Sequence, residues 1–364
     1  MIAPTSEEEM AAAVAAATAP VSVIGGGTRG ATGRGAALST AGLSGVRLHE
    51  PGALTLVAGA GTPVAEVEAR LAREGQRLAF EPMDHRGLLG TEGAPTLGGV
   101  MAGNVSGPRR VAAGAARDFA LGLRFVDGTG RVVANGGRVM KNVTGYDLVR
   151  LLCGSRGRLG VITEVALKVL PAPETQGMLV LEGLDVERAV AAMAAALGSP
   201  YEVTGAAHDP EQGRTWLRIE GFAAQVDYRL ERLAARLADF GPAEVVRDAD
   251  AVAGVWAGVR DVAAFHGAPG AVWRVHCRPS AAPALVARAG AEAALLDWGG
   301  GLIWLRVAEG ADLRARLGAF DGHATRVRGT GPEPAAPPEA PGVAALTEGL
   351  RRRFDPRGIF DTEG

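Results

Sequence analysis

The chain contains two glycine-rich tracts about 70 residues apart: Val23-Ile24-Gly25-Gly26-Gly27-Thr28-Arg29-Gly30 and Pro95-Thr96-Leu97-Gly98-Gly99-Val100-Met101-Ala102-Gly103-Asn104. Glycine has no Cβ atom, so the backbone N–H groups of such tracts can approach a bulky anion such as a phosphate. Because 53 of the 364 residues are glycine, either tract alone is weak evidence for a ligand. Together they indicate a site for a phosphorylated ligand.

The first tract also matches the G-x-G-x-x-G fingerprint of a Rossmann dinucleotide-binding fold. It follows a predicted strand at residues 21–24, and Glu50 lies about 20 residues further on, where the fingerprint places an acidic residue. In that fold the third glycine opens a helix whose N-terminus binds the pyrophosphate. Four more glycines follow at positions 33, 35, 42 and 45, and each would cost such a helix roughly 1 kcal/mol. We therefore expect a loop that forms an anion nest; a glycine-rich turn without a ligand is the simpler alternative.

The composition is that of a globular protein with more than one domain. Its 364 residues exceed the size of a typical single core, and 47% of them are hydrophobic. The net charge is −2, and a solvated helix face explains the one dense basic cluster, residues 351–353. These features argue against nucleic acid as a partner.

The sequence gives no indication of export or of a membrane anchor. Residues 1–9 are acidic and lack the basic region that starts a signal peptide. The most apolar later stretch, residues 295–307, contains two charged residues and three glycines, so we expect no membrane span. Cys153 and Cys277 are too few and too far apart for a disulfide framework or an iron–sulfur site, which favours a cytoplasmic location.

Short strands and few crossover helices are predicted for the first part of the chain. Ser6 and Glu9 form a capping box at the start of an alanine-rich helix that ends before Pro20. Thr62 is placed to cap a second helix, with Pro63 at its first position. Strands are predicted at residues 21–24, 54–58, 78–80, 121–126, 131–134 and 159–170. The fourth and fifth of these flank Asp127-Gly128-Thr129-Gly130 as a β-hairpin, so this part is α+β.

Pro171-Ala172-Pro173 indicates a boundary, after which strands and helices alternate. Strands are predicted at residues 178–182, 215–220, 271–277 and 301–307, and helices at 186–197, 225–240, 281–291 and 311–317. This order is typical of two β-α-β halves of a ferredoxin-like antiparallel sheet. A proline-rich segment, residues 331–341, precedes a last predicted helix at residues 343–353.

Five further segments follow one another around and after the second tract. They are FEPMD at 80–84, GNVSGP at 103–108, GAARD at 114–118, KNVTGYDL at 141–148 and GSRGRLGVITE at 154–164. In this order and spacing they resemble the FAD-binding domain of the vanillyl-alcohol oxidase / p-cresol methylhydroxylase (PCMH-type) superfamily. The segment 141–148 and the short chain are most similar to the FAD-binding subunits of bacterial glycolate oxidases.

The resemblance implies a PCMH-type FAD-binding domain of two α+β subdomains at residues 1–172. A smaller ferredoxin-like antiparallel α+β cap domain would follow at residues 173–330, for contact with substrate or partner. A proline-rich linker at 331–342 would lead to a C-terminal helix and tail at 343–364, which return to the FAD domain.

The resemblance also implies which residues hold FAD. The expected cofactor-binding residues are Val23, Ile24, Gly25, Gly26, Gly27, Thr28, Arg29, Pro82, Thr96, Gly98, Gly99, Gly103, Asn104, Gly107, Gly114, Gly160 and Ile162. The two tracts would enclose the pyrophosphate, and Gly160 and Ile162 would line the adenine and ribose end. Thr28 stands where relatives with covalent flavin carry a histidine, so noncovalent FAD is expected. Asp118 is expected to order its own loop.

The segment at 141–148 has two interpretations. Lys141, Asn142, Tyr146 and Asp147 either form a polar network near the flavin edge or a partner surface, or serve the local structure only.

The catalytic residues are not identified by the sequence. Relatives that oxidise 2-hydroxy acids unaided carry a histidine-rich segment in the second domain and an arginine for the carboxylate, whereas the histidines here are scattered. The nearest candidates are Arg274 and His276, which share one face of a predicted strand. Two ordinary strand residues are the alternative. No metal site is expected.

The implied function is that of the FAD-binding subunit of a glycolate oxidase complex. Glycolate would be oxidised to glyoxylate by hydride transfer to flavin N5. Electrons would pass to a larger FAD-containing subunit and an iron–sulfur subunit, in the cytoplasm or peripheral to the inner membrane through these partners. The alternatives are a free-standing FAD-dependent D-2-hydroxy-acid dehydrogenase and a non-catalytic scaffold.

Overall fold

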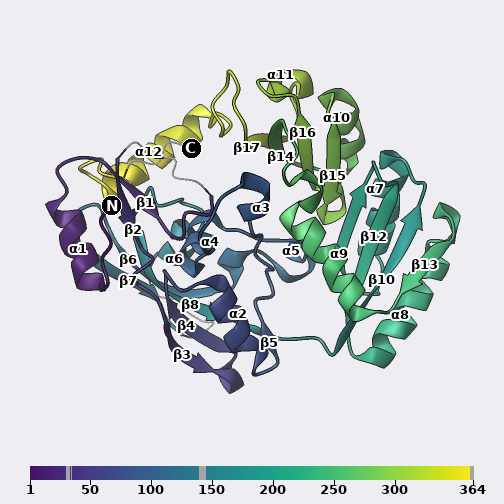
Figure 1. The fold of residues 1–364 in the computed structure, drawn as a ribbon, viewed down its shortest axis with the longest axis horizontal. Coiled ribbons are helices and arrows are strands. Elements are labelled where there is room, and N and C mark those ends of the chain that lie inside the picture. Colours follow the sequence, from purple (N-terminus) through teal and green to yellow (C-terminus); the bar gives the residue numbers. More distant parts are fainter. Residues whose placement is uncertain (30–32, 34, 139–144, 361–364) are drawn as a thin grey trace. The chain divides into compact units, whose positions relative to one another are not determined.

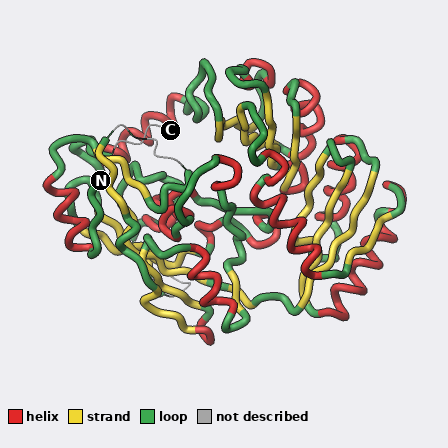
Figure 2. The backbone as a smooth tube through the Cα atoms, in the orientation of Figure 1, coloured by secondary structure: helices red, strands yellow, loops and turns green. Residues whose placement is uncertain are grey.

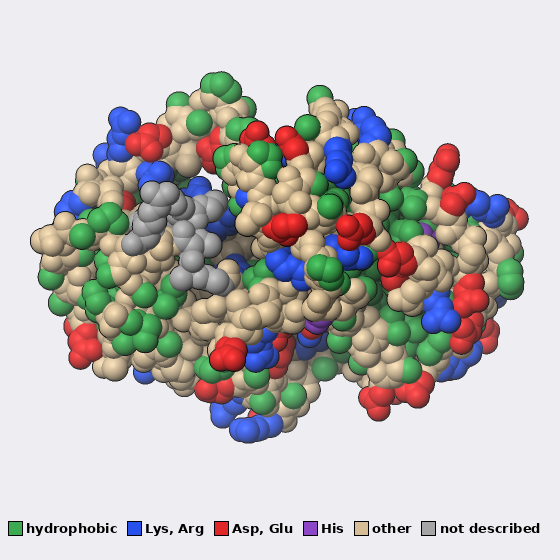
Figure 3. Space-filling view, turned by 45° about the horizontal axis from the view of Figure 1, so that its top comes forward, with side chains coloured by type: hydrophobic (Ala, Val, Ile, Leu, Met, Phe, Trp, Pro, Cys, Tyr) green, Lys and Arg blue, Asp and Glu red, His purple; other side chains and the backbone are tan. Residues whose placement is uncertain are grey.

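The computed structural model describes residues 1–29, 33, 35–138 and 145–360 (Figure 1). It divides into two compact units. The first comprises Met1–Ser106, Gly114–Ala172 and Glu339–Gly364, and the second comprises Gly107–Ala113 and Pro173–Pro338. Within the described ranges, no helix has both the length and the apolar character that crossing a membrane requires. On the face drawn in Figure 3, acidic and basic side chains are interspersed.

The first unit is built around a five-stranded antiparallel sheet with the strand order β3-β4-β8-β6-β7 (Figure 2). Its strands are β3 (Val46–Glu50), β4 (Thr55–Gly59), β6 (Ala120–Val126), β7 (Val132–Gly136) and β8 (Val161–Lys168). Two smaller sheets join β1 (Val21–Ile24) to β2 (Ala36–Ser39) in parallel, and β5 (Gln76–Arg77) to β9 (Leu170–Pro171). The helices are α1 (Glu7–Ala16), α2 (Val64–Ala72), α3 (Arg86–Leu89), α4 (Leu97–Gly103), α6 (Leu148–Leu152) and α12 (Pro341–Phe354).

The start and the end of the chain share one core in the first unit. The amide of Val21 donates to the carbonyl of Ile359 at 2.7 Å, and Val21 and Phe360 form a parallel bridge. Ile359 and Phe360 pack with Met10 and Val14 of α1. The carboxylate of Asp355 accepts hydrogen bonds from the amides of both residues, at 3.0 and 2.8 Å, and holds this turn in place.

The second unit contains an eight-stranded antiparallel sheet made of two βαββαβ halves. The first half is β10 (Thr175–Glu182), α7 (Val186–Leu197), β11 (Val203–Asp209), β12 (Arg214–Gly221), α8 (Ala223–Arg236) and β13 (Ala243–Val246). The second is β14 (Ala271–Cys277), α10 (Ala282–Ala289), β15 (Ala293–Asp297), β16 (Leu302–Val307), α11 (Leu313–Leu317) and β17 (Gly322–Arg328). The halves meet where β11 pairs with β15, and α9 (Ala249–Asp261) connects them in sequence. The predicted ferredoxin-like antiparallel α+β architecture is confirmed, but each half has four strands, whereas only two strands were predicted for each.

One face of this sheet forms the main hydrophobic core with the helices α7, α8, α10 and α11. Leu179, Leu217, Trp273 and Ile303 are among the fully buried strand residues that contact this layer. Because side chains alternate along a strand, the residues between them, such as Arg218 and Arg274, lie on the opposite face. That opposite face carries the polar side chains of this sheet that are discussed below.

Two local predictions need correction, and one is confirmed. Ser6 caps α1 as predicted, since its hydroxyl accepts from the amide of Glu9 at 3.1 Å. Thr62 does not cap α2: its hydroxyl donates to the carbonyl of Gly59 at 2.7 Å and accepts from the amide of Gly45, and Pro63 occupies the cap position. The strand predicted at residues 78–80 lies instead at β5, because pairing with β9 sets its position.

Candidate cofactor site

The two glycine-rich tracts lie directly against each other in the first unit. A Cβ atom on Gly25 would fall 2.4 Å from the hydroxyl oxygen of Thr96, and one on Gly26 would fall 1.7 Å from the carbonyl oxygen of Ala94. A Cβ on Gly93 would meet the carbonyl oxygen of Gly26 at 2.1 Å. These glycines are therefore required for the contact between the tracts themselves, whatever ligand they hold.

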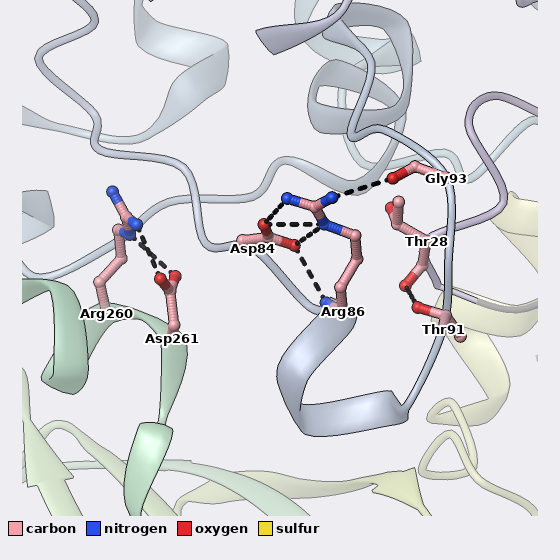
Figure 4. A network of polar contacts seen from close by, with 7 residues as sticks. All are labelled: Thr28, Asp84, Arg86, Thr91, Gly93, Arg260 and Asp261. Atoms are coloured by element: carbon pink, nitrogen blue, oxygen red, sulfur yellow. Dashed lines mark hydrogen bonds and ion pairs between the residues drawn. The ribbon is translucent and has the colours of Figure 1, made fainter. Parts of the chain in front are cut away.

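Side-chain bonds fix this contact (Figure 4). The hydroxyl of Thr91 donates to the carbonyl of Thr28 at 2.7 Å. The guanidinium of Arg86 donates to the carbonyl of Gly93 at 3.1 Å and pairs with Asp84 at 2.7 Å. The loop at residues 91–93, just before the second tract, is thus held by Thr28 and by Arg86. These bonds orient the backbone that follows the loop.

The second tract is a helix for most of its length, from Leu97 to Gly103. The hydroxyl of Thr96 accepts from the amide of Gly99 at 3.3 Å and caps the N-terminus of α4. Gly98 packs on Ala60, the residue after strand β4: its amide donates to the carbonyl of Ala60 at 2.7 Å, and a Cβ would lie 2.6 Å from the Ala60 side chain. The amide of Gly98 is therefore already used, and its small size serves helix-to-strand packing.

Two glycines leave open space where a ligand can approach. Gly27 has a φ of 73° and is exposed, and a Cβ there would meet nothing within 4 Å. A Cβ on Gly99 would contact only Thr96 and, at 3.6 Å, the guanidinium of Arg29. Among the described residues of the tracts, Gly27 and Gly99 therefore have open space beside them, and the guanidinium of Arg29 lies next to Gly99.

Arg29 provides the electrostatic character of the site. Its guanidinium donates to the carbonyl of Gly99, and a Cβ on Gly103 would overlap it. Burial, and after it the nearby Arg156 guanidinium, lowers the pKa of Arg29 to about 10, so the side chain is still protonated at neutral pH. Among residues 1–29, 33, 35–138 and 145–360, no carboxylate pairs with Arg29. A partly enclosed cation beside a second cation fits a ligand with negative charge, such as a pyrophosphate.

Several other predicted residues have clear local partners. Asn104 ends α4 in the left-handed conformation, and its side-chain oxygen accepts from the amide of Arg117 at 3.0 Å. Gly114 lies against Asp118, whose carboxylate accepts from the amide of Ala115 at 2.9 Å, so Asp118 orders its own loop as predicted.

The remaining predicted positions are dispersed. Val23 and Ile24 lie on β1, Pro82 is buried, and Ile162 is buried on β8 opposite Phe125. Gly160 packs on Phe125, which leaves no room for a Cβ. Gly107 belongs to the second unit, where its carbonyl accepts from the indole N–H of Trp298 at 3.0 Å. Lys141 and Asn142 lie outside the described residues; Tyr146 is exposed, and Asp147 caps α6.

Sequence reasoning missed three contributors to this site: Thr91, Ala94 and Arg156. Thr91 and Ala94 precede the second tract and meet the first one directly. Arg156 lies within a quoted segment, and its amide donates to the carbonyl of Ala102 near the end of α4. The spacing of glycines gave no signal for them, because their roles depend on contacts between distant segments.

The candidates Arg274 and His276 lie on β14 and share a face, as predicted, because both contact the indole ring of Trp298. His276 also forms a hydrogen bond with His323 of β17, with 2.7 Å between the two ring nitrogens. Within the described part of the chain, no three histidine, cysteine or acidic side chains are grouped to hold a metal ion.

Comparisons with known proteins agree with this geometry. The profile of a family described as "FAD binding domain" matches residues 1–136. The chain is 35% identical over 319 residues to the glycolate oxidase subunit GlcE of Escherichia coli K12, which covers 87% of this chain and 83% of that protein. It is 34% identical over 179 residues to a D-lactate dehydrogenase of Archaeoglobus fulgidus, covering 47% of this chain and 38% of the relative.

A solved structure, described as alkyldihydroxyacetonephosphate synthase, is similar to this fold with a TM-score of 0.69. It is 18% identical in sequence, and the match covers 100% of this chain and 76% of the other, so it supports the fold alone. The PCMH-type α+β fold and FAD as cofactor are thereby confirmed. The chain belongs to the family of FAD-dependent oxidoreductases that includes the glycolate oxidase subunit GlcE.

Proposed function

We propose that this chain is the FAD-binding subunit of a glycolate oxidase-type complex and holds its FAD noncovalently. The observation that carries the proposal is the enclosed Arg29 guanidinium, which lies beside Arg156 and between the two tracts without a described carboxylate partner. The similarity to GlcE over most of both chains supports the choice of complex.

The residues of the first unit would hold the pyrophosphate of FAD as follows. The guanidinium of Arg29 would neutralise its charge, and the open backbone at Gly27 and Gly99 would let its oxygens approach. Thr96 and Asn104 fix the two ends of α4 and so keep Gly99 and Gly103 in place around Arg29. When bound, FAD supplies the two-electron acceptor for oxidation of a CH–OH group. No histidine lies in either tract, which favours noncovalent binding.

The partners in this proposal are a larger FAD-containing subunit and an iron–sulfur subunit. The chain is 43% identical over 84 residues to the glycolate oxidase subunit GlcD of Bacillus subtilis, which covers 23% of this chain and 18% of that protein. We assign the base that deprotonates glycolate to the larger subunit. Both cysteines are free thiols, and burial raises the pKa of Cys153 to about 12, which accords with a cytoplasmic location.

The test is the flavin content of the purified chain. The wild type should be yellow, with absorbance near about 450 nm from bound flavin. Arg29→Gln removes the cation and should lower the retained FAD at least about tenfold. The matched control is Arg47→Gln, which changes an exposed arginine on β3 of the same unit and should retain FAD fully. Equal flavin content in the Arg29 variant and the wild type would refute the pyrophosphate assignment, and a colourless wild type would support the scaffold alternative.

A second candidate function is a free-standing FAD-dependent 2-hydroxy-acid dehydrogenase. It is favoured by one observation, the gathering of Arg274 and His276 around Trp298. The purified, FAD-loaded chain should then reduce a redox dye with glycolate or D-lactate in the absence of any partner. A yellow chain that is inactive alone and active after the larger subunit is added supports the subunit function instead.

A further inference from the structure

The two edges of the eight-stranded sheet differ in how much backbone they present to another chain. An edge strand carries N–H and C=O groups with which a further extended chain can pair. At one edge, β13 is only four residues long, and so short a strand offers little to such a chain. At the other edge, β17 is seven residues long and pairs, among the described strands, with β14 alone. The outer side of β17 is therefore the edge at which another chain could add.

The proline-rich segment that follows β17 turns back onto this outer edge. Its residues 331–338, which we call the strap, belong to the second unit, as β17 does. The amide of Arg326 on β17 donates to the carbonyl of Ala335 in the strap at 2.9 Å. The carbonyl of Ala324, on the same side of β17, accepts from Nε of Arg314 on α11 at 2.9 Å. Two backbone groups that could bind a neighbouring strand are thus already used within the chain.

Two arginines that lie over one buried tryptophan hold the strap in place. The guanidinium carbons of Arg314 and Arg326 lie 5.1 and 5.6 Å from the ring centroid of Trp273, which belongs to the main core. Such contacts with the face of an aromatic ring restrict where the guanidinium groups can point. Together they donate, at 2.7 to 2.9 Å, to three consecutive carbonyls of the strap, those of Glu333, Pro334 and Ala335. The core of the second unit therefore orients the side chains that bind the strap.

The turn between β17 and the strap depends on two glycines. Gly329 has a φ of 94°, and a Cβ atom there would lie 2.8 Å from the backbone of β14. A Cβ on Gly331 would lie 2.5 Å from the guanidinium of Arg326. Between them, the amide and the hydroxyl of Thr330 both donate to the carboxylate of Glu309. The shape of the backbone, as well as the two arginines, thus directs the strap to this edge.

We propose that the strap occupies the outer edge of β17 and thereby keeps a second copy of this chain from pairing with it. Two such edges are complementary to each other. With a two-fold axis at Thr325, an antiparallel arrangement directs the amide of Arg326 in each copy to the carbonyl of Ala324 in the other. The two Thr325 side chains then lie opposite each other, a pair that stabilises neighbouring strands. Release of the strap therefore replaces a contact within the chain by a contact between two copies.

Self-association of the FAD-loaded chain, measured by analytical ultracentrifugation, tests the strap. Arg314→Gln removes the bonds to β17 and to two strap carbonyls, so dimers should form at concentrations at least about tenfold lower than in the wild type. Arg326→Gln removes one side-chain bond to the strap and should have a smaller effect in the same direction. The matched control is Arg316→Gln on the same helix. It loses bonds to the carbonyls of Ala289 and Gly290 instead and should associate like the wild type.

Hydrogen exchange at the amide of Arg326 distinguishes edge pairing from unspecific aggregation. In the wild type this amide should be protected at every protein concentration, because the carbonyl of Ala335 binds it. In Arg314→Gln it should exchange at least about tenfold faster when the protein is dilute, and regain protection as dimers form. An unprotected amide in the wild type would overturn the strap, even if neither variant folds. Dimers that leave this amide unprotected, or unchanged association in both arginine variants, would overturn the pairing with a second copy.

Discussion

The two halves of the eight-stranded sheet have the same topology but differ in what lies on the face away from the main core. In the first half, α9 covers that face, with Trp256 packed on Gly205 and on the guanidinium of Arg218 at 4.4 Å. In the second half, the corresponding strands present Arg274, His276 and His323 near Trp298. The repeated fold therefore supplies two equivalent surfaces, and the connecting helix α9 covers the one in the first half.

The two halves also differ in the charged groups that lie close to their buried side chains. In the first half, Glu220 lies within reach of both Arg109 and Arg218, so buried positive and negative groups are matched. In the second half, the groups that act most strongly on His276 after burial are two arginines and a second histidine. Removing one member of such a matched buried pair would leave the other charge buried without its partner, which is costly.

Among the substitutions that test this comparison of the two halves, Trp256→Ala should change the free energy of unfolding most. The side chain is 1% exposed, and its loss would leave a large cavity beneath α9 and uncover Arg218. We expect the free energy of unfolding to fall by about 3–5 kcal/mol, measured by denaturant titration. Trp298→Ala in the second half is the comparison: this side chain is only partly buried, so its loss should cost less stability. Equal stability losses would show that the two faces do not differ in role.

Glu220→Gln should have the next largest effect, because it leaves Arg109 and Arg218 without their buried anion. We expect a loss of about 3 kcal/mol in stability, measured by denaturant titration. The matched control is Arg247→Gln, which breaks exposed pairs with Asp227 and Glu231 in the same half. That change should alter stability by less than about 1 kcal/mol. Equal stability in the Glu220 variant and the wild type would show that this buried carboxylate does not stabilise the arginines around it.

The free energy of unfolding should depend on pH because His276, in the second half of the sheet, is buried next to other basic groups. His276 has a folded-state pKa of about 3, below its ordinary value of about 6.5 in the unfolded chain. Between these values the unfolded state binds the proton and the folded state does not, so stability is lost as the pH falls below about 6.5. For this group alone the loss reaches about 3 kcal/mol at a pH of about 4. Thermal unfolding of His276→Asn should be less sensitive to acid; an unchanged pH profile would contradict the burial of a neutral imidazole.

The sequence was informative wherever one segment determines its own structure. The alternation of Trp273, Arg274, Val275 and His276 predicted which side chains share a face, and Ser6 predicted the cap of α1. The strands β11, β13, β15 and β17 were missed. β13 is only four residues long, β17 pairs with the distant strand β14, and β11 and β15 each join two partners, the strand that follows in sequence and each other. The sequence predicted that the two glycine-rich tracts lie opposite each other, whereas the direct fit of Gly26 to Ala94 was not foreseen.

The candidate site of the second unit shows the same limit more strongly. Arg274 and His276 could be found from their spacing, but Arg110 lies more than a hundred residues earlier and reaches the same Trp298 ring only in the folded chain. The ion pair of Arg109 with Glu220 and the hydrogen bond from Trp298 to Gly107 hold its segment there. Trp298 follows the end of β15 with a φ of 54°, a conformation that its residue type does not suggest. Contacts of this kind depend on the assembled sheet, and no local pattern encodes them.

The pairing of Val21 with Phe360 has a consequence for the order of events during synthesis. Met10, Val14 and Val21 are made well over 300 residues before Ile359 and Phe360, which complete their packing. The first unit therefore cannot close this core until residues 359 and 360 have been made and have reached it. Any step that needs the closed core must then wait for these late residues.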